Sequence, residues 1–310
     1  MSNTIKAVDL FCGCGGLSVG LGDAGFNVVA GIDAWQEAIE VYKINNHHDA
    51  LKMDISDVPL IVNTVTSYKP DLIAGGPPCQ DFSNAGSRVE GSRADLTNSF
   101  AKVVEAVQPG YFIMENVERA TKSKAFKSAY DRLASAGYGL SLHVLDASLC
   151  GVPQKRKRMF LVGAMGAPDN FLLPFVEAKL SKKPMTVRDY FGDECNFDHY
   201  YRHPRNYARR AVYSVDEPAA TIRGVNRPIP NGYKPHSGDT ADVSSVAPLS
   251  TAQRSRIQTF PPGYKWLGSK TAQEQMIGNA VPVNLGRFIG EALFAFDAST
   301  LLQGGLANAA

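Results

Sequence analysis

The sequence predicts an α/β protein with one large domain and a smaller one. Short apolar runs alternate with helical stretches through the first half of the chain, as in proteins built on a mostly parallel sheet. Several of these runs end in glycine, aspartate, glutamate or cysteine, and strand ends are where such sheets place reactive groups. The chain has 310 residues, of which 44% are hydrophobic, so it can bury a sizeable core.

The first predicted strand, 5–11, runs into the glycine-rich turn Cys12-Gly13-Cys14-Gly15-Gly16, and a helix is predicted over 18–24. A glycine turn between a strand and a helix start suits the polar groups of a ligand. The second strand, 25–33, ends in Asp33. This acid suits the two hydroxyls of a ribose, and it equally suits a helix N-cap. The glycine spacing is not the Gly-x-Gly-x-x-Gly of a dinucleotide site, which argues against a plain NAD enzyme.

Two further strand ends carry chemistry. A helix over 34–45 leads to a third strand, 50–54, whose last residue, Asp54, could accept from the exocyclic amine of an adenine. The next strand, 71–74, stops abruptly at Gly75-Gly76-Pro77-Pro78-Cys79-Gln80. Cys79 is there either a presented nucleophile or a small core residue in a turn.

The polar stretch 81–92 that follows is a candidate lid over Cys79, or an ordinary surface connection. A helix over 96–107 and a strand over 110–114 then lead to Glu115-Asn116-Val117. A carboxyl group at this strand end could serve as an acid if burial raises its pKa. The alternative is a surface glutamate.

A dense basic run, Lys155-Arg156-Lys157-Arg158, separates two predicted strands, 141–145 and 158–162, which follow a helix over 124–136. Such runs are usually solvated. This one abuts an apolar strand, so part of it is expected to point into a site, where arginine would suit a phosphate or a base carbonyl.

The composition changes after residue 164. Residues 165–248 are rich in proline, glycine and tyrosine and contain no long amphipathic helix. Arginines interleaved with tyrosines fit a nucleic-acid surface, or a small β-rich domain with solvated arginines. The arginines are Arg202, Arg205, Arg209, Arg210, Arg223 and Arg227. Helices are predicted over 250–259 and 285–296, with 301–310 as a frayed tail.

Composition excludes several classes of protein. The five scattered cysteines predict neither a disulfide framework nor a structural metal, and a reducing cytoplasm is expected. The sequence has no apolar run near the roughly 20 residues of a membrane span, and a secretory signal is not expected. The net charge of +2 neither requires nor excludes a nucleic-acid partner.

Together, and in this order, the motifs resemble those of the DNA cytosine-5 methyltransferases of bacterial restriction-modification systems. The matching stretches are Asp9-Leu10-Phe11-Cys12-Gly13-Cys14-Gly15-Gly16, Gly76-Pro77-Pro78-Cys79-Gln80, Glu115-Asn116-Val117, Gln154-Lys155-Arg156-Lys157-Arg158, Arg256-Ile257-Gln258-Thr259-Phe260-Pro261 and Gly278-Asn279-Ala280-Val281-Pro282. The resemblance implies a doubly wound, Rossmann-like catalytic domain that binds S-adenosylmethionine, formed by residues 1–168 and 275–310. It also implies a smaller, mainly β target-recognition domain over 169–274.

The resemblance also implies roles for single residues. Cys79 matches the nucleophile that adds to carbon 6 of a flipped-out cytosine, and Glu115 matches the residue at ring nitrogen 3 and the 4-amino group. Arg158 and Arg156 match arginines that contact the base carbonyl and a nearby phosphate. The residues that match cofactor contacts are Phe11, Gly13, Gly15, Gly16, Asp33, Asp54, Pro78, Leu96, Asn279 and Ala280.

For DNA we expect contacts from Gln80, Ser83 and the six arginines named above, with Arg223 or Arg227 reading guanine edges. Two departures from the family stand out. Many relatives carry glutamate where Asp33 stands, and many carry a bulky residue directly after that acid, whereas here Ala34 follows and Trp35 comes one position later.

The implied partner is double-stranded DNA, with no membrane, a monomeric enzyme in the bacterial cytoplasm, and a cognate restriction endonuclease acting separately. Two other functions compete with this one. A tRNA cytosine-5 methyltransferase on the same scaffold would typically carry Cys-Phe-Thr, which is absent here, and little recognition domain. A nucleic-acid binder that has lost catalysis would not be expected to keep Cys79, Glu115, Arg156 and Arg158.

Overall fold

The structure is a computed structural model that describes residues 4–78, 96–204, 206 and 208–307. Its centre is a seven-stranded sheet with the strand order β3-β2-β1-β4-β5-β8-β6. The strands are β1 (Lys6–Leu10), β2 (Asn27–Asp33), β3 (Asp49–Lys52), β4 (Leu72–Gly75), β5 (Tyr111–Val117), β6 (Tyr138–Asp146) and β8 (Lys157–Met165). The first five are parallel, and β8 runs antiparallel to both of its neighbours. This confirms the mixed α/β fold with a largely parallel sheet.

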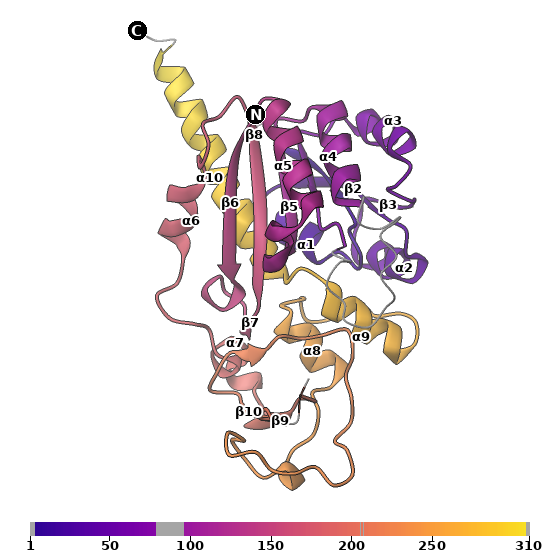
Figure 1. The fold of residues 1–310 in the computed structure, drawn as a ribbon, viewed down its shortest axis with the longest axis vertical. Helices are drawn as coiled ribbons and strands as arrows, with labels where there is room; N and C mark the ends of the chain where they lie inside the picture. The colour runs from indigo at the N-terminus through magenta and orange to yellow at the C-terminus, as the bar shows by residue number, and fades with distance from the viewer. Residues whose placement is uncertain (1–3, 79–95, 205, 207, 308–310) are drawn as a thin grey trace.

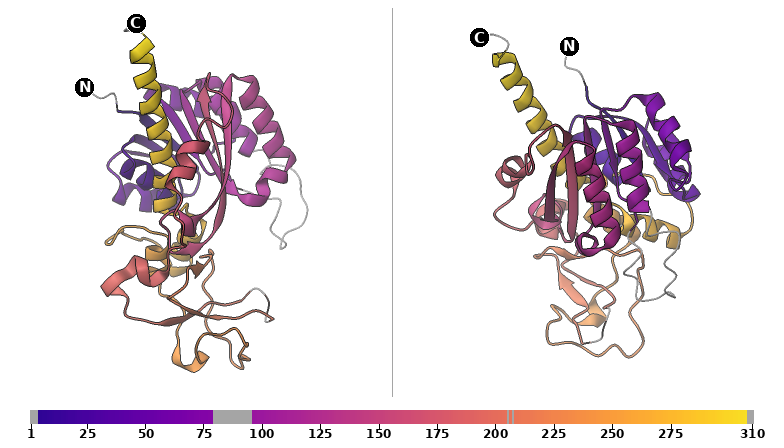
Figure 2. Two further views of the ribbon diagram at one scale, coloured as in Figure 1. Left: turned by 90° about the vertical axis from the view of Figure 1, so that its left-hand side faces the viewer. Right: turned by 45° about the horizontal axis from the view of Figure 1, so that its top comes forward.

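Helices cover both faces of the sheet (Figures 1 and 2). One face packs against α1 (Gly16–Asp23), α6 (Leu173–Lys179) and α10 (Val283–Ala307). The other face packs against α3 (Val58–Tyr68), α4 (Leu96–Val107) and α5 (Lys124–Ser135). The helix α2 (Gln36–Asn45) lies beside the end of the sheet that carries the glycine turn. No described helix is both long enough and apolar enough to cross a membrane.

Several elements differ from the sequence predictions. The helix α3 was not predicted, because four of the five residues 61–65 are β-branched and also suit a strand. The signal that could have found it is local: Asp57 accepts from the Leu60 N–H as an N-cap, and a proline follows in the first turn. The last helix continues through Ala307, so the tail from residue 301 is not frayed over that span.

The described part of the segment between α6 and α10 lies at one end of the sheet (Figure 1). It contains α7 (Val187–Phe191), α8 (Thr251–Ile257), α9 (Lys270–Asn279) and the short strands β9 (His199–Tyr201), β10 (Val212–Ser214) and β11 (Ala219–Ala220). In its described residues it is therefore mostly irregular rather than mainly β, since prolines and glycines interrupt its strands. The strand β11 pairs with β7 (Gln154–Lys155), which joins this segment to the basic run.

Candidate active site

A cavity of about 460 Å³ opens at the carboxyl ends of the parallel strands. The chain adds β2 and β3 on one side of β1, and then β4 and β5 on its other side, so the strand order reverses between the parallel neighbours β1 and β4. Open α/β sheets form their ligand crevices at such a reversal. Because β8 is antiparallel, its amino end brings Arg156 and Arg158 to the same edge. Lining residues predicted from the sequence are Phe11, Gly13, Gly16, Asp33, Asp54, Pro78, Leu96, Glu115, Arg156, Arg158, Asn279 and Ala280. Cys79, Gln80 and Ser83 lie outside the described residues.

The glycine turn is closely packed from behind. A Cβ on Gly16 would lie 2.2 Å from the Val281 carbonyl oxygen, so only glycine allows this approach between the turn and the start of α10. Gly15 has a φ of 96° and would place a Cβ 3.0 Å from the Tyr264 hydroxyl. These two contacts explain why the turn needs glycine at both positions.

Asp33 joins two loops of the cavity wall. One carboxylate oxygen accepts from the Gly13 N–H at 2.9 Å, and the other accepts from the Trp35 N–H at 2.8 Å. Burial raises its pKa. The N-cap of α2 is Trp35, so the capping alternative for Asp33 is wrong in detail, although its carboxylate does organise the helix start. Backbone N–H groups of Gly13, Ala34 and Trp35 bond the two oxygens, which together still keep capacity for a ligand hydroxyl.

The wall beyond Asp33 is mainly apolar. Trp35, Ile55 and Leu96 line it, while Asp54 lies exposed at the rim and accepts from the Ser56 N–H at 2.9 Å. That hydrogen bond holds the pKa of Asp54 below its usual value. Ile55 was not predicted from the sequence, although it directly follows Asp54, which was.

The opposite wall holds a buried ion pair. Glu115 is 8% exposed, and its carboxylate lies 2.8 Å from the Arg158 Nε. The surface alternative for Glu115 is therefore excluded. Burial raises the pKa of Glu115, while Arg158 and then Arg156 lower it. The neighbouring Asn116 donates its side-chain amide to the Pro77 carbonyl at 3.0 Å, which fixes the proline turn against the end of β5.

Arg156 lies in the same cavity wall but bonds to protein. Its guanidinium is 2% exposed and donates to the backbone carbonyls of Ile222, Gly278 and Ala280. Two buried glutamines that the sequence analysis quoted without a role, Gln154 and Gln258, bond to each other at 2.7 Å beside it.

A buried acid that the sequence analysis also left without a role lies behind the turn. Asp9 is 1% exposed and accepts from the Ser18 hydroxyl at 2.6 Å, and the Tyr42 hydroxyl in turn donates to Ser18 at 2.8 Å. Burial raises the pKa of Asp9 to about 7.

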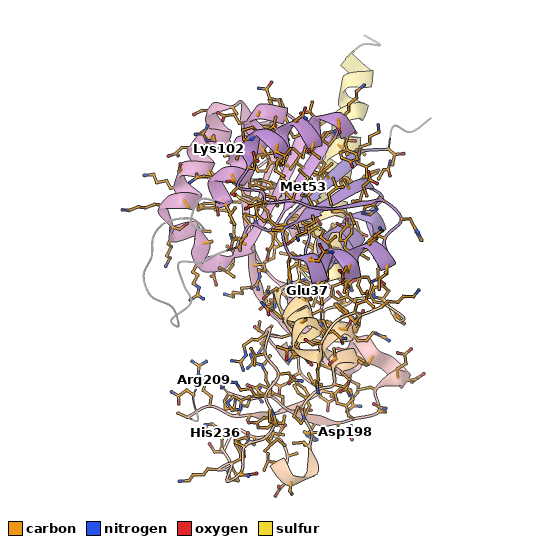
Figure 3. All side chains as sticks on the ribbon, turned by 90° about the vertical axis from the view of Figure 1, so that its right-hand side faces the viewer. Glu37, Met53, Lys102, Asp198, Arg209 and His236 are labelled. Atoms are coloured by element: carbon orange, nitrogen blue, oxygen red, sulfur yellow. The ribbon has the colours of Figure 1, made fainter. Side chains whose placement is uncertain are left out.

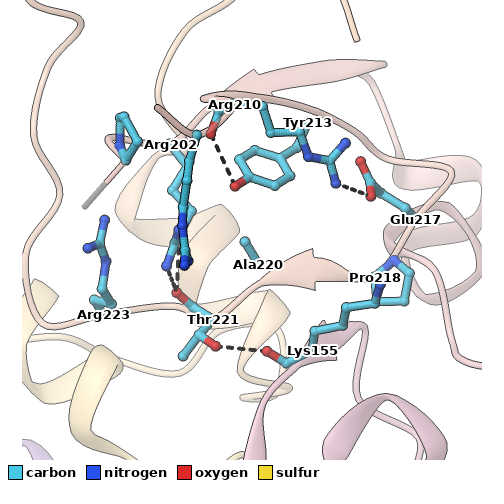
Figure 4. Close-up of a pocket in the computed structure, with 11 residues that line it drawn as sticks. Lys155, Arg202, Arg210, Tyr213, Glu217, Pro218, Ala220, Thr221 and Arg223 are labelled. Atoms are coloured by element: carbon cyan, nitrogen blue, oxygen red, sulfur yellow. Dashed lines mark hydrogen bonds and ion pairs between the residues drawn. The ribbon is translucent and has the colours of Figure 1, made fainter. Parts of the chain in front are cut away.

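A second cavity, of about 380 Å³, lies where the segment between α6 and α10 meets Lys155 of β7, and it collects four of the predicted arginines (Figure 4). Arg202 donates to the Thr221 carbonyl, and Arg210 stacks on Tyr213 and pairs with Glu217. Arg209 projects from the surface (Figure 3). Arg223, the fourth arginine of this cavity, donates to the His203 carbonyl. Of the two other predicted arginines, Arg227 is exposed and Arg205 lies outside the described residues.

A family model described as C-5 cytosine-specific DNA methylase matches residues 5–295. Among curated relatives, the Type II methyltransferase M.HindV of Haemophilus influenzae is 51% identical and covers 94% of this chain and 97% of its own length. The Type II methyltransferase M.HgiDI of Herpetosiphon aurantiacus is 52% identical and covers 94% of this chain and 95% of its own length.

Solved structures agree with the fold. The S. pombe Dnmt2 methyltransferase superposes with a TM-score of 0.68 at 18% identity, over 94% of this chain and 99% of that one. The Entamoeba histolytica methyltransferase EhMeth does so with a TM-score of 0.66 at 16% identity, over 95% of this chain and 99% of that one.

Proposed function

The chain belongs to the family of C-5 cytosine-specific DNA methylases, and we propose that it transfers a methyl group from S-adenosylmethionine to carbon 5 of a flipped-out cytosine in a specific duplex DNA sequence. The relatives that match nearly its whole length are named Type II methyltransferases, which favours a restriction-modification role. The observation that carries the proposal is the buried Glu115–Arg158 pair in one cavity with the glycine turn.

The first half of this cavity suits the cofactor. S-adenosylmethionine, when bound, supplies an electrophilic methyl group for carbon 5 of the base. Asp33 would accept from the ribose hydroxyls with its remaining lone pairs. Asp54 at the rim would accept from the adenine amine, and the apolar wall of Trp35 and Ile55 would pack on the adenine ring. Trp35 lines the cavity although it comes one position later than the bulky residue of many relatives, so it can take that residue's place against the adenine.

The second half suits the base. Cys79 directly follows Pro78, a residue of the cavity wall. Its thiolate forms a bond to carbon 6, which makes carbon 5 nucleophilic; after carbon 5 is methylated and loses its proton, the carbon–sulfur bond breaks and the thiolate is restored. Glu115 engages ring nitrogen 3 and the 4-amino group, because its buried carboxyl group can hold a proton there. Arg158 orients Glu115 and faces the base carbonyl.

For the DNA itself, we assign residues 1–168 and 275–310 to catalysis and 169–274 to target recognition. The target base must leave the helix to reach the cavity, because a stacked base is inaccessible. Among the arginines we propose that Arg227 reads a guanine edge, since the Arg223 guanidinium is already donated to the His203 carbonyl. The second cavity, with its excess of arginine over glutamate, suits DNA phosphates.

We place the enzyme in the bacterial cytoplasm as a monomer with a separate cognate endonuclease. The named relatives from Haemophilus influenzae and Herpetosiphon aurantiacus are Type II methyltransferases. Light scattering of the purified protein at micromolar concentration tests the monomer directly.

The covalent step is tested by trapping. Duplex DNA carrying 5-fluorocytosine should form a stable covalent complex with the wild-type enzyme and cofactor, because the fluorine cannot be lost as a cation. Cys79→Ser should form none. Unmodified duplex serves as the control. A wild-type enzyme that forms no adduct on any duplex refutes the mechanism, and labelled methyl found on tRNA but not on duplex DNA establishes the tRNA alternative.

A further inference from the structure

The buried Arg156 connects two parts of the chain that are distant in sequence. Its Nη1 donates to the Ile222 carbonyl at 2.9 Å, and its Nη2 donates to the Gly278 and Ala280 carbonyls at 3.0 and 3.1 Å. Ile222 begins residues 222–227, which we call the reading segment because they end in Arg227, the proposed reader of a guanine edge. Gly278 and Ala280 belong to the cavity wall that holds the proposed cofactor.

The same junction is held by two neutral side chains. The Gln154 side-chain oxygen accepts from the Ile222 N–H at 2.8 Å, and its amide donates to Gln258 at 2.7 Å. The Gln258 amide then donates to the Ala280 carbonyl at 3.1 Å. Gln154, Gln258 and Ile222 are buried, so a carbonyl or amide of theirs left without its partner would be costly.

The backbones themselves touch at this point. A Cβ on Gly278 would lie 2.1 Å from the Gly224 nitrogen and 2.2 Å from the Arg223 carbonyl carbon, so the reading segment packs directly on the end of α9. A Cβ on Gly224 would meet nothing closer than 3.4 Å. A side chain is therefore excluded at Gly278 but has room at Gly224.

The far side of the reading segment is anchored as well. Arg254 on α8 donates to the Arg223 carbonyl and pairs with Glu274 on α9, and both are almost fully buried. Asn226 donates to the Leu249 carbonyl at 2.8 Å. The segment is therefore anchored both to the cavity wall and to α8.

We propose that Arg156 is a positioning residue that sets the distance between the reading segment and the catalytic cavity, and thereby determines which cytosine relative to the recognised sequence is methylated. The inference rests on the proposed function. Its basis is that both terminal nitrogens of the guanidinium donate to backbone carbonyls, so Arg156 acts on the base through the backbone it holds. A lysine cannot replace it, because an ammonium group lacks the planar fork that reaches carbonyls on two segments.

The test is the distribution of methyl groups among cytosines. Arg156→Lys and Gly278→Ala should each raise the fraction of methyl groups at cytosines beside the main one by about tenfold, as read by bisulfite sequencing of a defined duplex. The matched controls are Lys157→Ala, which removes the exposed charge next to Arg156, and Gly224→Ala, which places a methyl group where it fits. Both should keep the wild-type distribution.

The fraction is measured per methyl group transferred, so a variant that is only partly folded does not shift it. An unchanged distribution in Arg156→Lys and Gly278→Ala overturns the proposal. If neither buried variant yields active enzyme, the same distribution of methyl groups is measured for Thr221→Val. This change removes one hydrogen bond next to the reading segment, from the Thr221 hydroxyl to the Lys155 carbonyl at 2.8 Å, at a half-buried position. Absence of cytosine methylation by the wild-type enzyme contradicts the proposed function instead.

Discussion

Replacing Arg158 with glutamine should destabilise the protein in a pH-dependent way. The change removes the cation that lies 2.8 Å from the Glu115 carboxylate, in a pair whose side chains are 16% and 11% exposed. Glutamine keeps much of the volume and a polar end, so the main loss is charge. Glu115 is then a buried carboxyl group whose principal opposing charge has gone.

The size of the effect follows from the geometry. Two unit charges 2.8 Å apart attract by about 6 kcal/mol at an effective dielectric constant of about 20. Desolvation of the two groups offsets several kcal/mol of this. We therefore expect the free energy of unfolding to fall by about 1–3 kcal/mol when Glu115 is ionised.

The sign of the pH dependence follows from the pKa of Glu115. Its value in the folded protein lies above the ordinary 4.5, so the folded protein binds more protons than the unfolded chain between these two values. The contribution of Glu115 to the free energy of unfolding is fully present at low pH and is lost as the pH rises through its pKa in the folded protein. Removing Arg158 raises that pKa further, which extends the loss upward in pH.

Urea unfolding at about pH 5 and about pH 8 measures this. The free energies of unfolding of wild type and Arg158→Gln should differ little at the lower pH and by the full amount of about 1–3 kcal/mol at the higher one. Lys157→Gln, an exposed neighbour on β8, is the control and should change neither value. The reasoning is refuted if the loss is equal at both pH values, or if the double variant Arg158→Gln with Glu115→Gln keeps the pH difference.

Three further predictions concern other parts of the cavity and the DNA surface. Burial raises the pKa of Asp9 from 3.8 to about 7, so the free energy of unfolding of the wild type should fall by up to about 4 kcal/mol as the pH rises from about 4 to about 7. Asp9→Asn should abolish this fall, and unfolding curves at both pH values check it. Gly16→Ala should weaken S-adenosylhomocysteine binding at least about tenfold in calorimetry, because its Cβ would lie 2.2 Å from the Val281 carbonyl; unchanged affinity contradicts the packing argument. Arg227→Ala should relax sequence preference in bisulfite sequencing, whereas Arg209→Ala should weaken binding to all duplexes alike and reduce the salt dependence by about one ion.

Much of the first half of the fold could be predicted because its signals are local. The glycine turn, the acid at the end of β2 and the proline turn after β4 mark strand ends by residue type alone. The helix α3 was missed because β-branched residues are ambiguous between helix and strand. The segment after β8 was predicted less well, since its short strands depend on pairing with distant partners such as β7.

For the site, the motifs predicted where Glu115 and Arg158 lie, but not that they pair. Their contact depends on the antiparallel register between β5 and β8, in which Val117 stands opposite Arg158. The roles assigned to Cys79 and to the cofactor residues stay predictions, and the trapping and binding experiments above test them.

The sequence by itself determined which residues could do chemistry, because turn residues, hydrophobic period and motif order are properties of neighbouring positions. Only the tertiary structure decided which partners Arg156 and Arg158 bind. Arg158 pairs with Glu115, while Arg156, two positions away, reaches carbonyls 66 and 122 residues further along the chain. Such partners are set by the packing of whole segments, since burial requires a backbone carbonyl from anywhere in the chain to find a donor.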